Sequence, residues 1–265
     1  MPGTDGEVPM ESFWPWMQEY LLQFAIAILK TGKIPQHVAF EMDGNRRYAR
    51  QHHLAVREGH SQGCHSLYRL LDSTYKCGVK VVTIYLFSTE NFNRTDAEVQ
   101  DLMELFIYMM DKFSAPGEVL DRNGVCLRIL GQRELIRADV LAAADRGIER
   151  TRHNSKLRSN LFMTAAVVSA VQGHLNPPLE ATKDGVAPDG GGSIQMASLE
   201  NHIFTADNPP MDLLIRTSGV ERLSDFLLWQ VHQDTELFFV KTLWPAFSFF
   251  HFAAILFEWQ WRRSR

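Results

Sequence analysis

The sequence DGNRR at residues 43–47 combines residue types that could bind a phosphorylated ligand. It follows an apolar run that begins at His37 and is typical of a buried strand. Arginine side chains pair in a forked geometry with phosphate oxygens. A carboxylate would only repel a phosphate unless a divalent cation lay between them, so Asp43 indicates Mg²⁺. The alternative is a surface turn that begins a helix, because Asp-Gly and Asn are common turn formers.

Three further polar clusters follow apolar stretches later in the chain. They are STENFNR at 88–94, RTSG at 216–219 and RLSD at 222–225. In the last cluster Ser224 is a predicted N-cap for a helix over FLLWQ, whose first amides could bind an anion. Each cluster alone could be a cap or a solvated loop. Together, at one end of a parallel sheet, they predict a site for two phosphorylated ligands, with guanidinium groups from Arg47, Arg94, Arg216 and Arg222.

Alternating strands and helices must position these clusters. Residues Val79–Phe87 form a continuously apolar, β-branched run, as in a strand that is buried on both faces. The other predicted strands are the run from His37, Cys126–Leu130, Leu161–Ala166, Leu213–Thr217 and Glu236–Val240. Predicted helices lie between them at Gly59–Tyr75, from Thr95 to about Phe113, and at Arg133–Arg152. This alternation predicts one α/β domain with a central six-stranded, mostly parallel β-sheet flanked by helices.

The predicted helix after Thr95 is apolar around most of its circumference. Thr95 can cap it, and Glu98 would complete a capping box. Leucine, methionine and phenylalanine dominate residues 102–113. Such a helix is buried in a core or lines an apolar cavity.

Composition limits the function classes. The chain has 265 residues and a net charge of −4, so no general basic field would attract nucleic acid. The three cysteines, Cys64, Cys77 and Cys126, form no CxxC pair and are expected to be buried thiols in a reducing compartment. The sequence does not begin like a signal peptide. Residues 176–193, rich in Pro and Gly, are predicted to form a surface loop.

The segment Phe13–Lys30 raises the question of a membrane. It is rich in aromatic and aliphatic residues, but Pro15, Gln18 and Glu19 interrupt it. Trp14 and other apolar residues suit a helix that lies in a membrane interface. A helix packed on the domain or on a partner is the equal alternative, and a transmembrane helix is the least favoured. The expected organisation is an N-terminal aromatic helical segment over 1–33 and a catalytic domain over 34–265.

The same clusters carry a family resemblance. In order and spacing, five motifs resemble those of the cis-prenyltransferases, which include undecaprenyl and dehydrodolichyl diphosphate synthases. They are HVAFEMDGNRRYAR (37–50), GHSQG (59–63), FSTENFNR (87–94), DLLIRTSG with RLSDFLLWQ (212–230), and ELFF with LWPAF (236–247). The resemblance runs from about Lys33 to Phe257. The residues within its motifs are most similar to those of the eukaryotic, dolichol-type branch.

The resemblance implies a reaction and the residues that perform it. An Mg²⁺-dependent transferase would elongate farnesyl diphosphate with isopentenyl diphosphate to a long cis-polyprenyl diphosphate, in an apolar tunnel partly formed by residues 102–113. The implied catalytic residues are Asp43, Asn45, His60, Ser88 and Asn91. The implied substrate-binding residues are Gly44, Arg46, Arg47, Glu90, Arg94, Arg216, Arg222 and Ser224. The implied metal ligands are Asp43 and Glu236. The group that accepts the proton is either the bound diphosphate or Asp43 together with Asn45.

Departures from the family pattern concern activity and partners. Glu41 replaces an apolar residue in the first strand, where an unpaired acid would be costly. Val56 replaces a family arginine, with Arg57 one place away, and Ala165–Ser169 replace an arginine-containing segment. The last residues, WQWRRSR, lack the Arg-x-Gly tail of single-subunit members. We therefore expect a second, Nogo-B-receptor-like subunit. The resemblance also implies peripheral attachment to the cytoplasmic face of the endoplasmic reticulum membrane or to lipid droplets. The alternative is a non-catalytic or weakly active homologue that stabilises a prenyltransferase partner.

Overall fold

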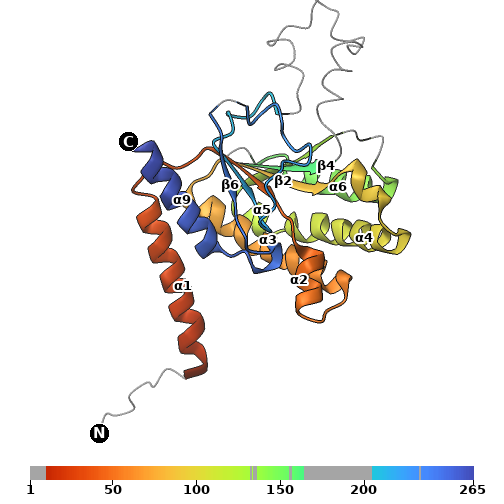
Figure 1. The fold of residues 1–265 in the computed structure, drawn as a ribbon, viewed down its shortest axis with the longest axis horizontal. Helices are drawn as coiled ribbons and strands as arrows, with labels where there is room; N and C mark the ends of the chain where they lie inside the picture. The colour runs from red at the N-terminus through yellow and green to blue at the C-terminus, as the bar shows by residue number, and fades with distance from the viewer. Residues whose placement is uncertain (1–9, 132, 134–135, 155–156, 164–204, 233) are drawn as a thin grey trace, which may run out of the picture.

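The fold is an α/β domain with one sheet (Figure 1). The computed structural model describes residues 10–131, 133, 136–154, 157–163, 205–232 and 234–265. The strands are β1 (His37–Glu41), β2 (Val81–Phe87), β3 (Val125–Leu130), β4 (Leu157–Met163), β5 (Leu213–Arg216) and β6 (Glu236–Phe239). The helices are α1 (Met10–Leu29), α2 (Asn45–Gln51), α3 (Val56–Cys77), α4 (Asp96–Phe113), α5 (Val119–Arg122), α6 (Ala138–Thr151) and α9 (Phe249–Arg263), with 3₁₀ helices η1 (Thr89–Asn93) and η4 (Trp244–Ala246).

The sheet has six strands in the order β3-β4-β2-β1-β5-β6, and every neighbouring pair is parallel. The predicted six-stranded sheet is therefore confirmed. The first strand, β1, lies between β2 and β5, so the strand order reverses there. In open α/β sheets, ligands bind at the carboxyl ends of the strands at such a switch point. The segments after β1, β2 and β5 carry three of the four polar clusters.

The main core lies between one face of the sheet and the helices. Alternate β1 residues, Val38 and Phe40, pack in this core with residues of α3, α4, α6 and α9. The intervening Ala39 points to the other face, where a smaller apolar cluster contains Phe226 and Leu227. Because both faces are covered, the central strand β2 is almost entirely apolar, as the sequence predicted.

Two details of the predicted secondary structure are wrong. Strand β4 begins at Leu157, earlier than the expected Leu161, because Arg158, Ser159 and Asn160 also pair with β2 and β3. The helix expected after Ser224 is absent from the described structure, where residues 224–232 form turns.

Backbone geometry explains why that helix does not form. Ser224, Asp225 and Leu227 have positive φ angles of 45°, 60° and 52°. An L-residue at positive φ cannot belong to a right-handed helix. The turns instead bury Phe226 and Leu227 in the smaller cluster, so Ser224 is not an N-cap.

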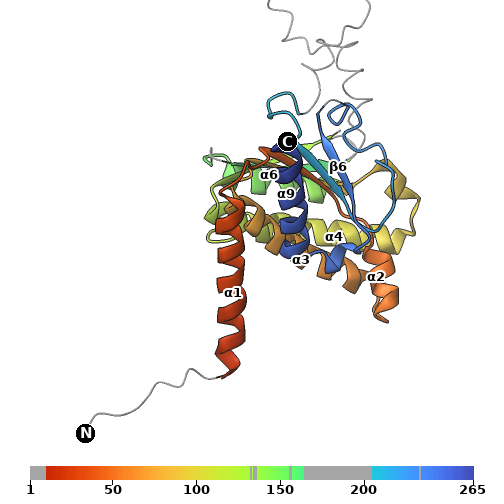
Figure 2. The ribbon, with the colours of Figure 1, turned by 60° about the vertical axis from the view of Figure 1, so that its left-hand side comes forward.

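Two helices at the ends of the described chain lie side by side. The α9 residue Gln260 donates hydrogen bonds to the backbone carbonyls of Leu29 and Lys33, both 2.8 Å long. From there α1 extends past the rest of the domain (Figures 1 and 2). In the described part of the chain, every helix falls short of the length or apolar character that a membrane crossing requires. The predicted loop at 176–193 lies outside the described residues.

Candidate active site

The site begins with the backbone turn after β1. Gly44 has φ 121°, and a Cβ there would lie 2.9 Å from the backbone nitrogen of Trp244, so glycine is required on both counts. Trp244 fixes the turn through its backbone N–H, which donates to the Asp43 carbonyl over 3.0 Å. The indole N–H of Trp244 donates to the Gly63 carbonyl on α3 over 2.9 Å. These contacts hold Asp43 and Asn45 at the end of the sheet.

The Asp43 carboxylate is held by groups at the end of β5 and by one arginine of α2. Its Oδ2 accepts hydrogen bonds from Ser218 Oγ at 2.8 Å, Arg216 Nη2 at 3.1 Å and Arg47 Nη2 at 3.3 Å. Burial alone would raise the pKa of Asp43, but the hydrogen bonds from Ser218 and Arg216 lower it below its usual value. Asp43 is therefore an anion at neutral pH.

Arg216 is the buried centre of this group. Its side chain is only 2% exposed, and its Nη1 contacts the Glu41 carboxylate, Ser224 Oγ at 2.8 Å and the Arg222 carbonyl at 2.7 Å. Glu41, which would be costly in a strand without a partner, is therefore paired. Burial raises the pKa of Glu41 to about 7, and Arg216 opposes that rise.

A second charged group lies across α2, α3 and α4. Arg94 Nη1 donates to Glu98 Oε1 over 2.9 Å, and Arg46 Nη1 lies 3.9 Å from Glu98 Oε2. The Nε2 atom of His60 lies 3.7 Å from Glu98 Oε1 and, within the described structure, has no hydrogen-bond partner. Burial, helped by repulsion from Arg94, lowers the pKa of His60 to about 4. His60 is therefore neutral at pH 7. The predicted cap is confirmed in part: Thr95 Oγ1 accepts from the Glu98 backbone N–H over 3.3 Å, but the Glu98 side chain binds Arg94 and not the Thr95 backbone, as a capping box would require.

The segment after β2 completes the rim. Asn91 Oδ1 accepts from the Ser88 backbone N–H over 3.1 Å, which fixes the turn that carries Ser88 and Glu90. Tyr85, near the end of β2, donates from its hydroxyl to the Ser224 carbonyl over 3.1 Å. This bond joins the β2 side of the rim to the β5 side.

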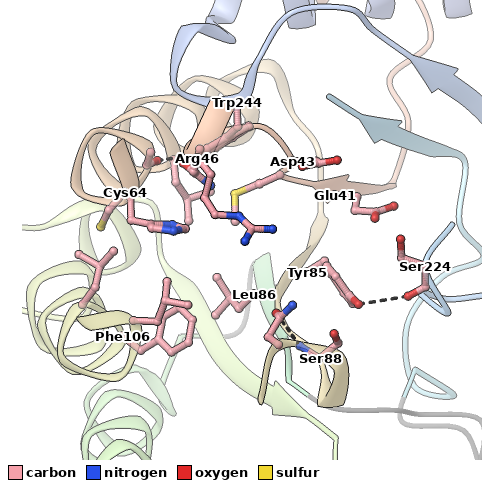
Figure 3. Close-up of a pocket in the computed structure, with 18 of the residues that line it drawn as sticks. Glu41, Asp43, Arg46, Cys64, Tyr85, Leu86, Ser88, Phe106, Ser224 and Trp244 are labelled. Atoms are coloured by element: carbon pink, nitrogen blue, oxygen red, sulfur yellow. Dashed lines mark hydrogen bonds between the residues drawn. The ribbon is translucent and has the colours of Figure 1, made fainter. Parts of the chain in front are cut away.

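These groups surround one cavity of about 460 Å³. In Figure 3, Glu41, Asp43 and Ser224 lie on one side of it, Cys64 and Phe106 on the other, and the Arg46 side chain projects between them. The predicted site residues that line the cavity are Asp43, Asn45, Arg46, His60, Ser88, Glu90, Asn91, Arg94, Arg216, Arg222 and Ser224. Its apolar lining comes mainly from Leu67, Leu86, Leu102, Leu105, Phe106 and Met109. The cavity thus joins a charged rim to an apolar floor.

Three predicted site residues do not line the cavity. Gly44 forms the turn, and Arg47 acts next to the cavity through Asp43 and the Ser218 carbonyl. The structure does not bring Glu236 to Asp43. Glu236 lies level with Leu213 and Val38, at the amino ends of the strands, roughly 10 Å along them from Glu41 and Arg216. Its carboxylate pairs with Arg262 and Arg263 of α9.

Several cavity residues were missed by sequence reasoning. Tyr85 lies within an apolar strand, and only its hydroxyl group could have indicated a place in the site. Trp244 belonged to the LWPAF motif, but its hydrogen bonds to Asp43 and Gly63 cross the fold and cannot be inferred from spacing. Arg57 lies outside the cavity, where it pairs with Asp101 and Glu104.

The residues present fit a divalent cation shared with a ligand. Asp43 Oδ1 accepts no hydrogen bond within the described structure, and the side chain is 33% exposed. Mg²⁺ commonly takes one or two protein carboxylates together with phosphate oxygens and water. Among the described residues, His, Cys, Asp and Glu side chains do not gather in groups of three or more that could hold a metal by themselves. A cation here would therefore take its other ligands from phosphate oxygens and water.

The fold and the cavity define a class of protein that binds an apolar chain with an anionic head group. The prenyltransferase family model, described for undecaprenyl diphosphate synthase, matches residues 42–265. The chain therefore belongs to this family, the cis-prenyltransferases.

Individual relatives support this assignment. A dehydrodolichyl diphosphate synthase complex subunit of Schizosaccharomyces pombe is 39% identical over 92% of each chain. The corresponding subunit of Homo sapiens is 33% identical over 94% of this chain and 75% of the human one. The crystal structure of lavandulyl diphosphate synthase from Lavandula x intermedia, in complex with dimethylallyl diphosphate, has a TM-score of 0.74. It is 26% identical and covers 85% of this chain and 95% of that chain.

Proposed function

We propose that this chain condenses isopentenyl diphosphate onto an allylic diphosphate, farnesyl diphosphate, to give a long cis-polyprenyl diphosphate of the dehydrodolichyl type. The observation that carries the proposal is the single cavity, in which anion-binding groups surround Asp43 and the floor is apolar. A head group and a hydrocarbon chain need both surfaces in one cavity. The assignment of isopentenyl diphosphate to Arg216, Arg222 and Ser224 follows the family resemblance.

Different residues would act on different steps of the reaction. A carbon–oxygen bond of the allylic diphosphate breaks, and a carbon–carbon bond to the isopentenyl unit forms. One proton leaves that unit for the bound diphosphate or for Asp43 with Asn45. Arg46 and Arg94 are placed to stabilise the departing diphosphate, because fixed cations lower the energy of developing negative charge. Neutral His60 can donate one hydrogen bond to the same group. When bound to Asp43, Mg²⁺ would neutralise diphosphate charge as a Lewis acid.

The apolar floor accounts for chain growth. The residues from α4 that line it, Leu102, Leu105, Phe106 and Met109, carry no charge. A growing hydrocarbon chain is stabilised there by about 0.8 kcal/mol for each buried methylene group. We assign this part of the cavity as the start of the product tunnel.

A second subunit and a membrane belong to the same proposal. Relatives in Schizosaccharomyces pombe and Homo sapiens are named as complex subunits. We infer that this chain also works in a heteromer with a Nogo-B-receptor-like subunit. Attachment to the cytoplasmic face of the endoplasmic reticulum membrane, through α1, would place a lipid product near its destination.

Replacement of Asp43 tests the activity. Asp43→Ala removes Oδ1, an oxygen that is open to a cation, and it leaves Arg216 without one of its two carboxylate partners. We expect incorporation of radiolabelled isopentenyl diphosphate to fall roughly a thousandfold. Asp145→Ala, on the exposed face of α6, is the matched control and should retain full activity. An Asp43→Ala protein that elongates at the wild-type rate would overturn the proposal. It would favour a non-catalytic stabilising subunit instead.

A further inference from the structure

Tyr85 lines the cavity, but the proposed function gives it no role. It lies near the end of β2, and its hydroxyl donates to the backbone carbonyl of Ser224 over 3.1 Å (Figure 3). Its ring also contacts the ring of buried Phe226, with centroids 4.9 Å apart. Tyr85 therefore touches residues 222–227, the rim segment, at two points: through its hydroxyl and through its ring.

The rim segment carries two of the groups assigned to isopentenyl diphosphate. Ser224 Oγ accepts from Arg216 Nη1 over 2.8 Å and from Arg222 Nε over 3.3 Å. The two guanidinium groups thus meet at one hydroxyl, and the place of Ser224 sets the spacing between them. Because arginine forks bind phosphate oxygens in a defined geometry, a displaced Ser224 would weaken the site.

The conformation of the rim segment is not one that its own residues prefer. Three of them have positive φ angles, among them Ser224 at 45°, although the sequence alone predicts a helix there. Such a backbone persists only where its surroundings hold it. Hydrogen bonds from outside the segment hold two of its carbonyls, since Arg216 Nη1 donates to the Arg222 carbonyl over 2.7 Å and Tyr85 donates to that of Ser224. Arg216 would also bind the diphosphate, so Tyr85 is the donor that can hold the segment before the ligand arrives.

We propose that Tyr85 is a positioning residue for isopentenyl diphosphate: its hydroxyl holds the rim segment so that Ser224 Oγ reaches Arg216 and Arg222. When only a fraction of the molecules has the binding-competent conformation, the observed affinity falls by that fraction. At saturating isopentenyl diphosphate the ligand itself would hold the segment, so kcat should be preserved. The inference rests on the proposed function, because it takes isopentenyl diphosphate as the ligand of this group.

The test compares two tyrosine-to-phenylalanine variants of the full-length chain. Tyr85→Phe removes the hydroxyl and keeps the ring that contacts Phe226. Tyr75→Phe is the matched control: Tyr75 is buried, and its hydroxyl also donates to a backbone carbonyl, that of Arg158, over 3.1 Å, but it does not line the cavity. Both variants lose the same kind of bond, and thermal melting checks that they lose similar stability.

Calorimetric titration in Mg²⁺ gives the dissociation constant of isopentenyl diphosphate, which does not react alone. Steady-state kinetics gives kcat and the KM for farnesyl diphosphate. In Tyr85→Phe we expect the dissociation constant to rise about fivefold, the usual net effect of one hydrogen bond, with kcat and the KM for farnesyl diphosphate within about twofold of the wild type. Tyr75→Phe should match the wild type in all three quantities.

A double-mutant comparison shows whether Tyr85 acts through Ser224. Ser224→Ala removes the hydroxyl that joins the two arginines and keeps the carbonyl to which Tyr85 donates. If Tyr85 acts by placing that hydroxyl, adding Tyr85→Phe to Ser224→Ala should raise the dissociation constant by less than about twofold. An equal rise in both backgrounds would contradict the inference.

Other results would also overturn the role of Tyr85 and leave the proposed function standing. They are an unchanged dissociation constant in Tyr85→Phe, an equal rise in Tyr75→Phe, which would reflect stability alone, and a loss confined to kcat, which would place Tyr85 in the chemistry. If the wild type fails to bind isopentenyl diphosphate, the proposed function fails, and the inference fails with it.

Discussion

At the scale of single residues, the position of Asn45 depends on the absence of a side chain on α3. A Cβ at Gly63 would lie 2.2 Å from Asn45 Oδ1 and 2.9 Å from Trp244 Cδ1. Asn45 Oδ1 is buried in the cavity and has no hydrogen-bond partner in the described structure, so it is available to a ligand. Gly63 thus allows α3 to lie close to the turn that carries Asp43 and Asn45.

Gly63→Ala should displace Asn45 and Trp244 without unfolding the helix, because alanine is the best helix former. A displacement of about 1 Å at a reacting centre commonly costs about a hundredfold in rate. We expect a loss of that size in kcat/KM for isopentenyl diphosphate. Gln62→Ala, an exposed neighbour on the same helix, should be silent. Wild-type kinetics in Gly63→Ala would show that Asn45 has no role.

The sequence predicted which types of residue form the site, but it did not predict which side chains pair with each other. Asp43 and Arg216 were predicted because acids, amides and arginines followed apolar strands. The pair of Glu41 with Arg216 joins residues 175 positions apart, so the sequence could not show that Glu41 has a partner. Glu236 was predicted to be a metal ligand because of its motif. The strand register instead puts it at the amino end of β6, away from Asp43.

At the scale of elements, long apolar runs predicted the secondary structure correctly, whereas short apolar stretches did not. The buried strand β2 and the apolar helix α4 were both identified from long apolar runs. The stretch FLLWQ was also apolar, yet it forms turns, because burial of Phe226 and Leu227 under the sheet outweighs helix propensity. Strand β4 was placed too late because Arg158, Ser159 and Asn160 do not look like a buried strand.

The N-terminal helix α1 makes a prediction about lipid binding. Tyr20, Leu21, Phe24 and Ile28 recur on its exposed face, between 46% and 58% exposed, while Ile26 and Leu29 face the domain. Exposed aromatic and aliphatic residues at helical spacing suit a helix that lies in a membrane interface. The double substitution of Phe24 and Ile28 by serine should weaken sedimentation with phosphatidylcholine–phosphatidylserine vesicles about tenfold or more.

The control for this experiment is Gln18→Ser, at an exposed polar position of the same helix. It should bind vesicles like the wild type. Equal sedimentation of the double variant would assign the apolar face of α1 to a protein partner instead.

At the scale of the whole molecule, the strand order decides where chemistry can occur. Because β1 lies between β2 and β5, the segments after these three strands converge at one rim. The convergence of four polar clusters was predicted because they follow strands of one parallel sheet, and the common cavity confirms it. The depth of the apolar floor could not be predicted, since it depends on how α3 and α4 pack against the sheet.

The assembly of the active enzyme is the remaining question at this scale. The heteromer proposed above predicts that full activity needs a second chain. Purified alone, this chain should incorporate isopentenyl diphosphate slowly. Co-expression with a Nogo-B-receptor-like subunit should raise incorporation by about tenfold or more, because the partner would add positive charge at the diphosphates. The same complex carrying Asp43→Ala should be inactive, which would place the chemistry in this chain. Robust elongation by the isolated chain would contradict the need for a partner, and it would mean that Arg46, Arg94, Arg216 and Arg222 suffice to bind both diphosphates.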